Sequence, residues 1–92
     1  MTFVYMIKDN MGNLYIGVSN NPTKRLHDHN HKQGAVFTND GNFRIVFLEK
    51  HSTLKEARSR EVQIKKWRRE KKEMLVVKYE QGLETKFNGK ER

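Results

Sequence analysis

Cysteine is absent from this sequence, which excludes disulfide scaffolds, thiolate zinc sites and thiol nucleophiles. No apolar stretch approaches the roughly 18 residues that a membrane-spanning helix needs, and the basic start of a signal peptide is missing. These absences predict one cytoplasmic domain without a membrane partner. The 92 residues, 35% of them hydrophobic, suffice for a small two-layer fold but not for two separate cores.

Positive charge dominates the composition. The chain has 19 Lys and Arg against 11 Asp and Glu, a net charge of +8. Residues 55–73 alone hold nine Lys or Arg and four Glu, a net +5. This balance favours a polyanionic partner, most simply DNA or RNA, and we expect no small-molecule cofactor. The alternative is a basic surface that only confers solubility.

Hydrophobic and turn patterns predict the order strand, strand, helix, strand, helix, which implies an α+β domain with a small three-stranded sheet. An Asn before Pro22, and Ser52 or Thr53, are suited to cap the two helices. We expect the domain to span residues 1–80 and residues 81–92 to form a poorly ordered basic tail. The expected elements are strands at Phe3–Lys8, Leu14–Ser19 and Phe43–Lys50, a helix from Pro22 to about His31 or Lys32, a helix at about Leu54–Arg69, and a further helix or turn at Lys71–Lys78.

The first two strands form a β-hairpin around the turn residues 9–13. A period of two directs Leu14, Ile16 and Val18 to one face of the second strand and the residues between them to the other. A turn centred near Asn10 brings Tyr5 nearly opposite Tyr15, a register that a one-residue slip would change.

Glu61 stands where a hydrophobic residue is expected. On a helical wheel, Leu54, Ala57, Ile64 and Trp67 form the apolar stripe of the long helix, and Glu61 falls on that stripe. A carboxylate facing a core or cleft is unfavourable unless a cation or hydrogen bonds compensate it. Three explanations stay open: a salt bridge to Lys or Arg, a position at the margin that reaches solvent, or a role as metal ligand, acid or base.

The rest of the long helix and its continuation are strongly basic. These side chains resemble a phosphate-contacting surface, and the alternative is a solvated helix face with Glu–Lys pairs. The main candidates for binding nucleic acid are Lys65, Lys66, Arg68 and Arg69, and the surface also includes Arg58, Arg60, Lys71 and Lys72.

Three histidines alternate in the first helix. His27 and His31 are four residues apart and could chelate zinc, but the HExxH pattern of metalloproteases is absent. The favoured interpretation exposes two histidines and leaves His29 facing the sheet beside Arg25, which shares its helix face.

Five of these features follow one another in a set order: Tyr5, the motif Tyr15-Ile16-Gly17 ten residues on, Arg25 a further ten on, His29, and Glu61. This set resembles the GIY-YIG nuclease family, most closely its small stand-alone bacterial members, from about residue 3 to residue 75. The resemblance implies a three-stranded antiparallel sheet flanked by helices. It also implies hydrolysis of a phosphodiester with one divalent metal ion, Mg²⁺ or Mn²⁺.

The resemblance implies a role for each residue of the set. Glu61 would ligate the metal through hard carboxylate oxygens, and Arg25 would bind phosphate as a permanently charged planar fork. Tyr5 would take a proton from the attacking water, directly or through His29. Tyr15 would orient water or phosphate.

Gly17, which has no side chain, would leave room for the nucleic-acid backbone. Two positions depart from the family pattern: Phe3-Val4 replaces Gly-Ile before the first tyrosine, and Val18 stands where some relatives have Lys. A late Asn found in many relatives has no clear counterpart, although Lys65 or Lys66 falls near that place.

The leading hypothesis is a metal-dependent endonuclease acting on DNA, with branched or damaged DNA and RNA as further candidate substrates. The departures motivate a second hypothesis, a nucleic-acid-binding domain that retains the scaffold without turnover. A third hypothesis, a structural protein-interaction module, would gain support if the chain bound no nucleic acid at low salt.

Overall fold

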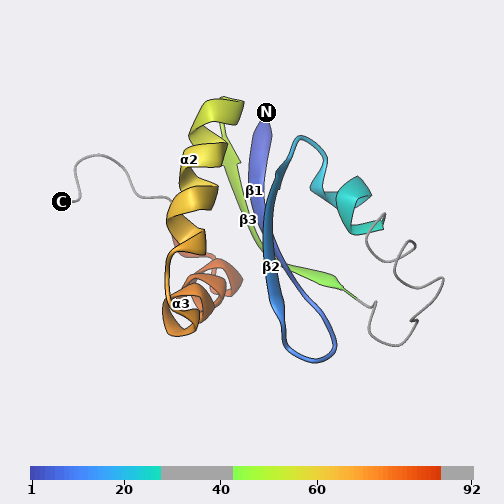
Figure 1. Ribbon diagram of the computed structural model, residues 1–92, viewed down its shortest axis with the longest axis vertical. Coiled ribbons are helices and arrows are strands. Elements are labelled where there is room, and N and C mark those ends of the chain that lie inside the picture. Colours follow the sequence, from blue (N-terminus) through green and yellow to red (C-terminus); the bar gives the residue numbers. More distant parts are fainter. Residues whose placement is uncertain (28–42, 86–92) are drawn as a thin grey trace.

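A three-stranded antiparallel sheet in the order β2-β1-β3 forms the centre of the computed structural model, which describes residues 1–27 and 43–85. The helices α2 and α3 lie on one side of the sheet, and a helix at residues 22–27 lies on the other (Figure 1). The predicted α+β architecture is therefore confirmed. The element bounds are β1 (Thr2–Lys8), β2 (Leu14–Ser19), β3 (Arg44–His51), α2 (Leu54–Lys65) and α3 (Arg69–Glu80). Within residues 1–27 and 43–85, the helices lack the length and the continuous apolar surface of a transmembrane span.

The hairpin register differs from the prediction. Tyr5 pairs with Gly17 and Ile7 pairs with Tyr15, so the expected Tyr5–Tyr15 pairing is wrong by two residues of β2. The turn centres on Met11 because the Asp9 carboxylate accepts hydrogen bonds from the backbone N–H groups of Met11 and Asn13, both at 2.9 Å. A side chain–backbone turn of this kind sets the register, because the turn defines the first pair.

The core lies between the sheet and the two C-terminal helices. Val4 and Met6 of β1 are fully buried there against Phe47 of β3 and Ile64 of α2. The predicted apolar face of β2 is confirmed, because its members pack against this cluster. The packed residues are Leu14, Ile16, Val18 and Trp67 around the buried Val4, Met6, Val46, Phe47, Ala57, Ile64, Leu75 and Val76.

The predicted further helix at Lys71–Lys78 is confirmed as α3, and the predicted helix at about Leu54–Arg69 is shorter than expected. It ends at Lys65, and Arg68 adopts an extended backbone (φ −71°, ψ 161°) as the N-cap of α3. Trp67 lies between the two helices. Arg60 Cζ of α2 is 5.4 Å and Lys71 Nζ of α3 is 4.4 Å from its ring centroid, which is a cation–π arrangement. The apolar stripe is shorter than predicted, since Leu54 is 52% exposed.

Arg60 is buried, which corrects its assignment to a phosphate-contacting surface. Its Nε donates to Glu49 Oε1 at 2.9 Å and its Nη2 donates to the Thr85 carbonyl at 2.8 Å. The Glu49 carboxylate also accepts from Thr85 Oγ1 and lies 2.9 Å from His51 Nε2. Burial opposes ionisation of Glu49, but Arg60 outweighs it and holds the pKa of this carboxyl below its ordinary value. Residues 86–92 of the expected tail lie outside the described residues.

Candidate active site

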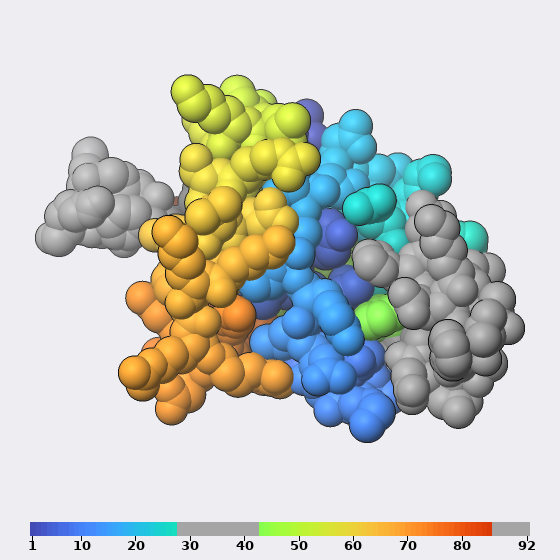
Figure 2. All heavy atoms as spheres, in the orientation of Figure 1, coloured from blue at the N-terminus to red at the C-terminus, as the bar shows by residue number. Residues whose placement is uncertain are grey.

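An open pocket of about 350 Å³ lies at β2, an edge strand of the sheet. In the space-filling view, α2 and β2 lie side by side, and residues 20–27 border the strands on the opposite side (Figure 2). The pocket therefore collects side chains from both faces of the sheet. Its lining residues are Tyr5, Tyr15, Ile16, Gly17, Val18, Arg25, Arg58 and Glu61.

Tyr5 lies directly over Gly17 on the neighbouring strand. The two residues are register partners, and Tyr5 is only 4% exposed. A Cβ atom on Gly17 would stand 2.6 Å from Cζ and 3.0 Å from Cε2 of the tyrosine ring. The room that Gly17 leaves is thus taken by Tyr5 rather than by nucleic-acid backbone, and the glycine positions the tyrosine in the pocket.

We expect Gly17→Ala to lower the free energy of unfolding by about 1–3 kcal/mol, because the buried Tyr5 ring has to move. Urea denaturation measures the loss. In a Tyr5→Leu background the ring is gone, and the same change should become neutral or stabilising by about 0.5–1 kcal/mol, as alanine usually is over glycine in a strand. An equal loss in both backgrounds would refute the contact.

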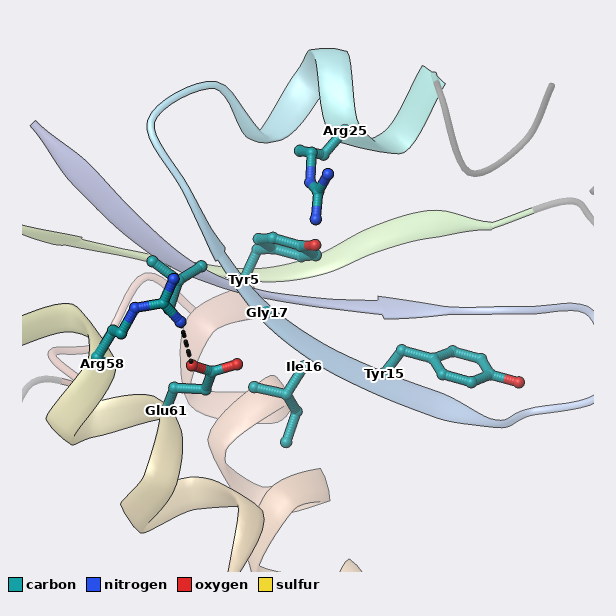
Figure 3. A pocket seen from close by; sticks show the side chains of 8 residues that line it. Tyr5, Tyr15, Ile16, Gly17, Arg25, Arg58 and Glu61 are labelled. Carbon is teal, nitrogen blue, oxygen red and sulfur yellow. Dashed lines mark ion pairs between the residues drawn. The ribbon is translucent and has the colours of Figure 1, made fainter. Parts of the chain in front are cut away.

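Arg25 enters the pocket from the helix at residues 22–27. The predicted start of this helix is confirmed: Pro22 is its first residue, and Asn21 Oδ1 accepts from the Lys24 backbone N–H at 3.1 Å. The exposed Arg25 side chain points toward Tyr5 (Figure 3). The Asn21 cap fixes the start of this helix and so positions Arg25 over the face of the sheet that carries Tyr5.

Glu61 approaches the same strand from α2, on the other face. Its side chain is 12% exposed, with Arg58 Nη1 3.7 Å from Oε1 and Lys65 Nζ 3.2 Å from Oε2. Of the three explanations for this carboxylate, the salt bridge is therefore observed, and the same side chain also lines the pocket. Both cations are more than half exposed, so neither seals the carboxylate from solvent.

Tyr15 extends along β2 away from Glu61 and Tyr5 (Figure 3). Its hydroxyl lies 3.4 Å from Asp9 Oδ2, and its ring meets Phe43 edge to face with centroids 5.4 Å apart. Partial burial and the Asp9 carboxylate raise the pKa of Tyr15 above its ordinary value. Tyr5, Arg25 and Glu61 thus line one pocket, with Tyr5 and Arg25 on one face of the sheet and Glu61 on the other, whereas the Tyr15 phenol lies at the far wall (Figure 3).

Asp9 is a residue that sequence reasoning missed, except as part of a turn. Burial opposes its ionisation, but hydrogen bonds from Asn13 and Met11 outweigh burial and hold the pKa of Asp9 below its ordinary value. It therefore carries the charge that anchors Tyr15 and the hairpin turn. The available signal was an Asp three residues before the Gly12 position, where φ is +89°.

The remaining candidate residues differ in their exposure and in their ion pairing. Lys66 and Arg68 are exposed, while Arg69 pairs with Glu73 through Nη2 and Oε2 at 2.6 Å. His27 is exposed, and His29 and His31 lie outside the described residues. A zinc site at His27 and His31 and the role of His29 therefore stay predictions.

The pocket suits a single hard cation. Residues 1–27 and 43–85 contain no cluster of three or more His, Cys, Asp or Glu able to hold a metal, and Glu61 is the only carboxylate among the described lining residues. One carboxylate is typical for Mg²⁺ or Mn²⁺ when water and phosphate oxygens fill the other positions. The donor set therefore fits one such ion at Glu61.

Comparison with known proteins identifies the family of this chain. The family model of the GIY-YIG catalytic domain matches residues 1–74. A UPF0213 protein from Clostridium perfringens (strain 13 / Type A) is 39% identical over 77 residues, covering 83% of each chain. A UPF0213 protein from Staphylococcus aureus (strain Mu3 / ATCC 700698) is 37% identical over 75 residues, covering 80% of this chain and 92% of the relative. No solved structure matches the chain. From the matched domain and these relatives, the chain belongs to the GIY-YIG family of nucleases, whose members generally depend on a divalent metal ion.

Proposed function

We propose that this protein is an endonuclease that hydrolyses DNA phosphodiester bonds with one divalent ion, Mg²⁺ or Mn²⁺. The observation that carries the proposal is the meeting of Tyr5, Arg25 and Glu61 in one pocket. These residues come from β1, the helix at residues 22–27, and α2. A base candidate, a permanent cation and a hard-oxygen ligand are the groups that phosphodiester hydrolysis requires.

Each of the three residues has a chemical task in this proposal. Glu61 would hold the ion, which supplies Lewis-acid neutralisation of the phosphate charge. Arg25 would bind the phosphate oxygens and stabilise the charge that develops on them. The Tyr5 hydroxyl would accept a proton from the attacking water, directly or through His29. Tyr15, with its hydroxyl against Asp9, would form the far wall rather than transfer the proton.

DNA is the proposed substrate because the protein is strongly cationic. Lys66 and Arg68, between α2 and α3, are exposed, and the whole chain carries +8. Lys65 and Arg69 each have a carboxylate partner and would contribute to phosphate binding only by leaving it. Branched DNA and RNA are tested beside duplex DNA, since a cationic surface attracts all three.

The proposal predicts nicking of supercoiled plasmid in Mg²⁺ or Mn²⁺ and none in EDTA. Arg25→Ala should lower the nicking rate by about 100-fold to 1,000-fold, the usual effect of removing one transition-state donor. The matched control is Lys24→Ala, which removes a neighbouring exposed charge and should retain the wild-type rate. Equal trace activity in wild type, Arg25→Ala and EDTA would identify a contaminant and overturn the proposal.

The second candidate is a nucleic-acid-binding domain without turnover. Two cations already pair with Glu61, at 3.7 Å and 3.2 Å, and a domain without turnover has no need to displace them. It predicts DNA binding that weakens with salt and with substitution of Lys66 or Arg68 but does not respond to metal. A metal requirement for cleavage decides against it.

A further inference from the structure

Arg58 is the second arginine of the pocket. Its side chain is 63% exposed, and its Nη1 lies 3.7 Å from Glu61 Oε1. It comes from α2, whereas Arg25 comes from the helix at residues 22–27, so the two guanidinium groups reach the pocket from opposite sides of β2 (Figure 3). A strand of nucleic acid that crosses this edge would meet both.

We propose that Arg58 exchanges partners during binding. In the free protein it neutralises Glu61, and when a divalent ion binds Glu61 it turns to a backbone phosphate of the substrate. The inference rests on the proposed function, because it assumes an ion at Glu61. It adds a second phosphate-binding residue and couples binding of the ion to binding of the substrate.

The exchange is favourable because the ion pair is weak and the released group suits phosphate. The arginine is 63% exposed and its Nη1 is 3.7 Å from the carboxylate, so the pair contributes little stability and a doubly charged ion displaces the guanidinium readily. Lys65 holds the other carboxylate oxygen, at 3.2 Å, but it is absent from the pocket lining. Arg58 is therefore the cation whose release adds a planar donor fork to the pocket, and this fork matches phosphate geometry.

Two titrations of Arg58→Ala test the exchange. In the first, electron paramagnetic resonance follows Mn²⁺ binding to the protein without DNA. Loss of the competing guanidinium should tighten Mn²⁺ binding by about twofold to fivefold. In the second, fluorescence anisotropy follows binding of a labelled 20-base-pair duplex across a salt series. The slope of log Kd against log salt should become shallower by about 0.9 in Ca²⁺, where one phosphate contact is lost, and stay unchanged in EDTA.

The matched control is Arg44→Ala, which removes an exposed arginine from β3 at the opposite edge of the sheet. If Arg58→Ala has the same Mn²⁺ affinity as this control, or the same salt slope in Ca²⁺, the exchange is wrong. Glu61→Gln distinguishes failure of the proposed ion site from failure of the Arg58 exchange. If wild type binds Mn²⁺ and Glu61→Gln does not, the proposed ion site stands whatever Arg58 does. If the two proteins bind Mn²⁺ equally, both the proposed function and the exchange fail.

Discussion

Glu61→Gln is expected to abolish metal-dependent cleavage of DNA, with a loss of about 100-fold or more in rate. Glutamine has nearly the same shape, but it lacks the negative charge that a divalent ion requires. The fold should persist, because this side chain lies at the pocket and is not part of the apolar core. Plasmid nicking in Mg²⁺ or Mn²⁺ measures the rate, and circular dichroism checks the fold.

Glu70→Gln is the matched control for this experiment. Glu70 is an exposed glutamate in the first turn of α3, and its loss should leave cleavage at the wild-type level. Unchanged nicking by Glu61→Gln would remove Glu61 from the chemistry and return it to a purely electrostatic role beside Arg58 and Lys65.

Arg60→Ala should lower the free energy of unfolding by about 3–5 kcal/mol. The change leaves the buried Glu49 carboxylate, whose side chain is 2% exposed, without its guanidinium partner. That loss is a large fraction of the total stability of a small domain. Urea denaturation of wild type and variant at neutral pH provides the measurement.

Arg58→Ala is the control for stability, because it removes an exposed arginine two residues earlier in the same helix. It should change the free energy of unfolding by no more than about 0.5 kcal/mol. The double variant Glu49→Leu/Arg60→Met should recover much of the stability, since it removes both buried charges and retains apolar volume. Similar losses in the free energy of unfolding for Arg58→Ala and Arg60→Ala would show that the buried Glu49–Arg60 pair contributes no more stability than an exposed arginine.

The pH dependence of stability follows from the same pair. The pKa of Glu49 is lowered from 4.5 in the folded state, so its contribution is fully present above pH 4.5 and is lost as pH falls through the folded-state pKa. The difference in stability between wild type and Glu49→Gln should therefore shrink below pH 4.5. Asp9 and Glu73 also have lowered pKa values and remain in both proteins, so the difference isolates Glu49.

Element order and helix starts could be predicted from the sequence, because their signals are local. Alternation of side chains marks β2, and Asn21 with Pro22 starts the first helix through contacts within four residues. The ordered tyrosine, arginine and glutamate positions likewise pointed to the family without any coordinates. Short-range stereochemistry determines the elements and the helix starts, whereas the family resemblance rests on residue identity and spacing along the chain.

Long-range geometry was decided by the tertiary structure. A helical wheel separates Arg60 and Glu61 by about 100°, and only the fold shows that Arg60 is paired with Glu49 on β3, 11 residues earlier, and with the Thr85 carbonyl. The hairpin register depended on hydrogen bonds to the Asp9 carboxylate, and the position of Tyr5 over Gly17 depended on that register. The sequence alone thus determined which groups are available for chemistry. The fold decided which of them share a pocket, because burial and charge pairing act between residues that are distant along the chain.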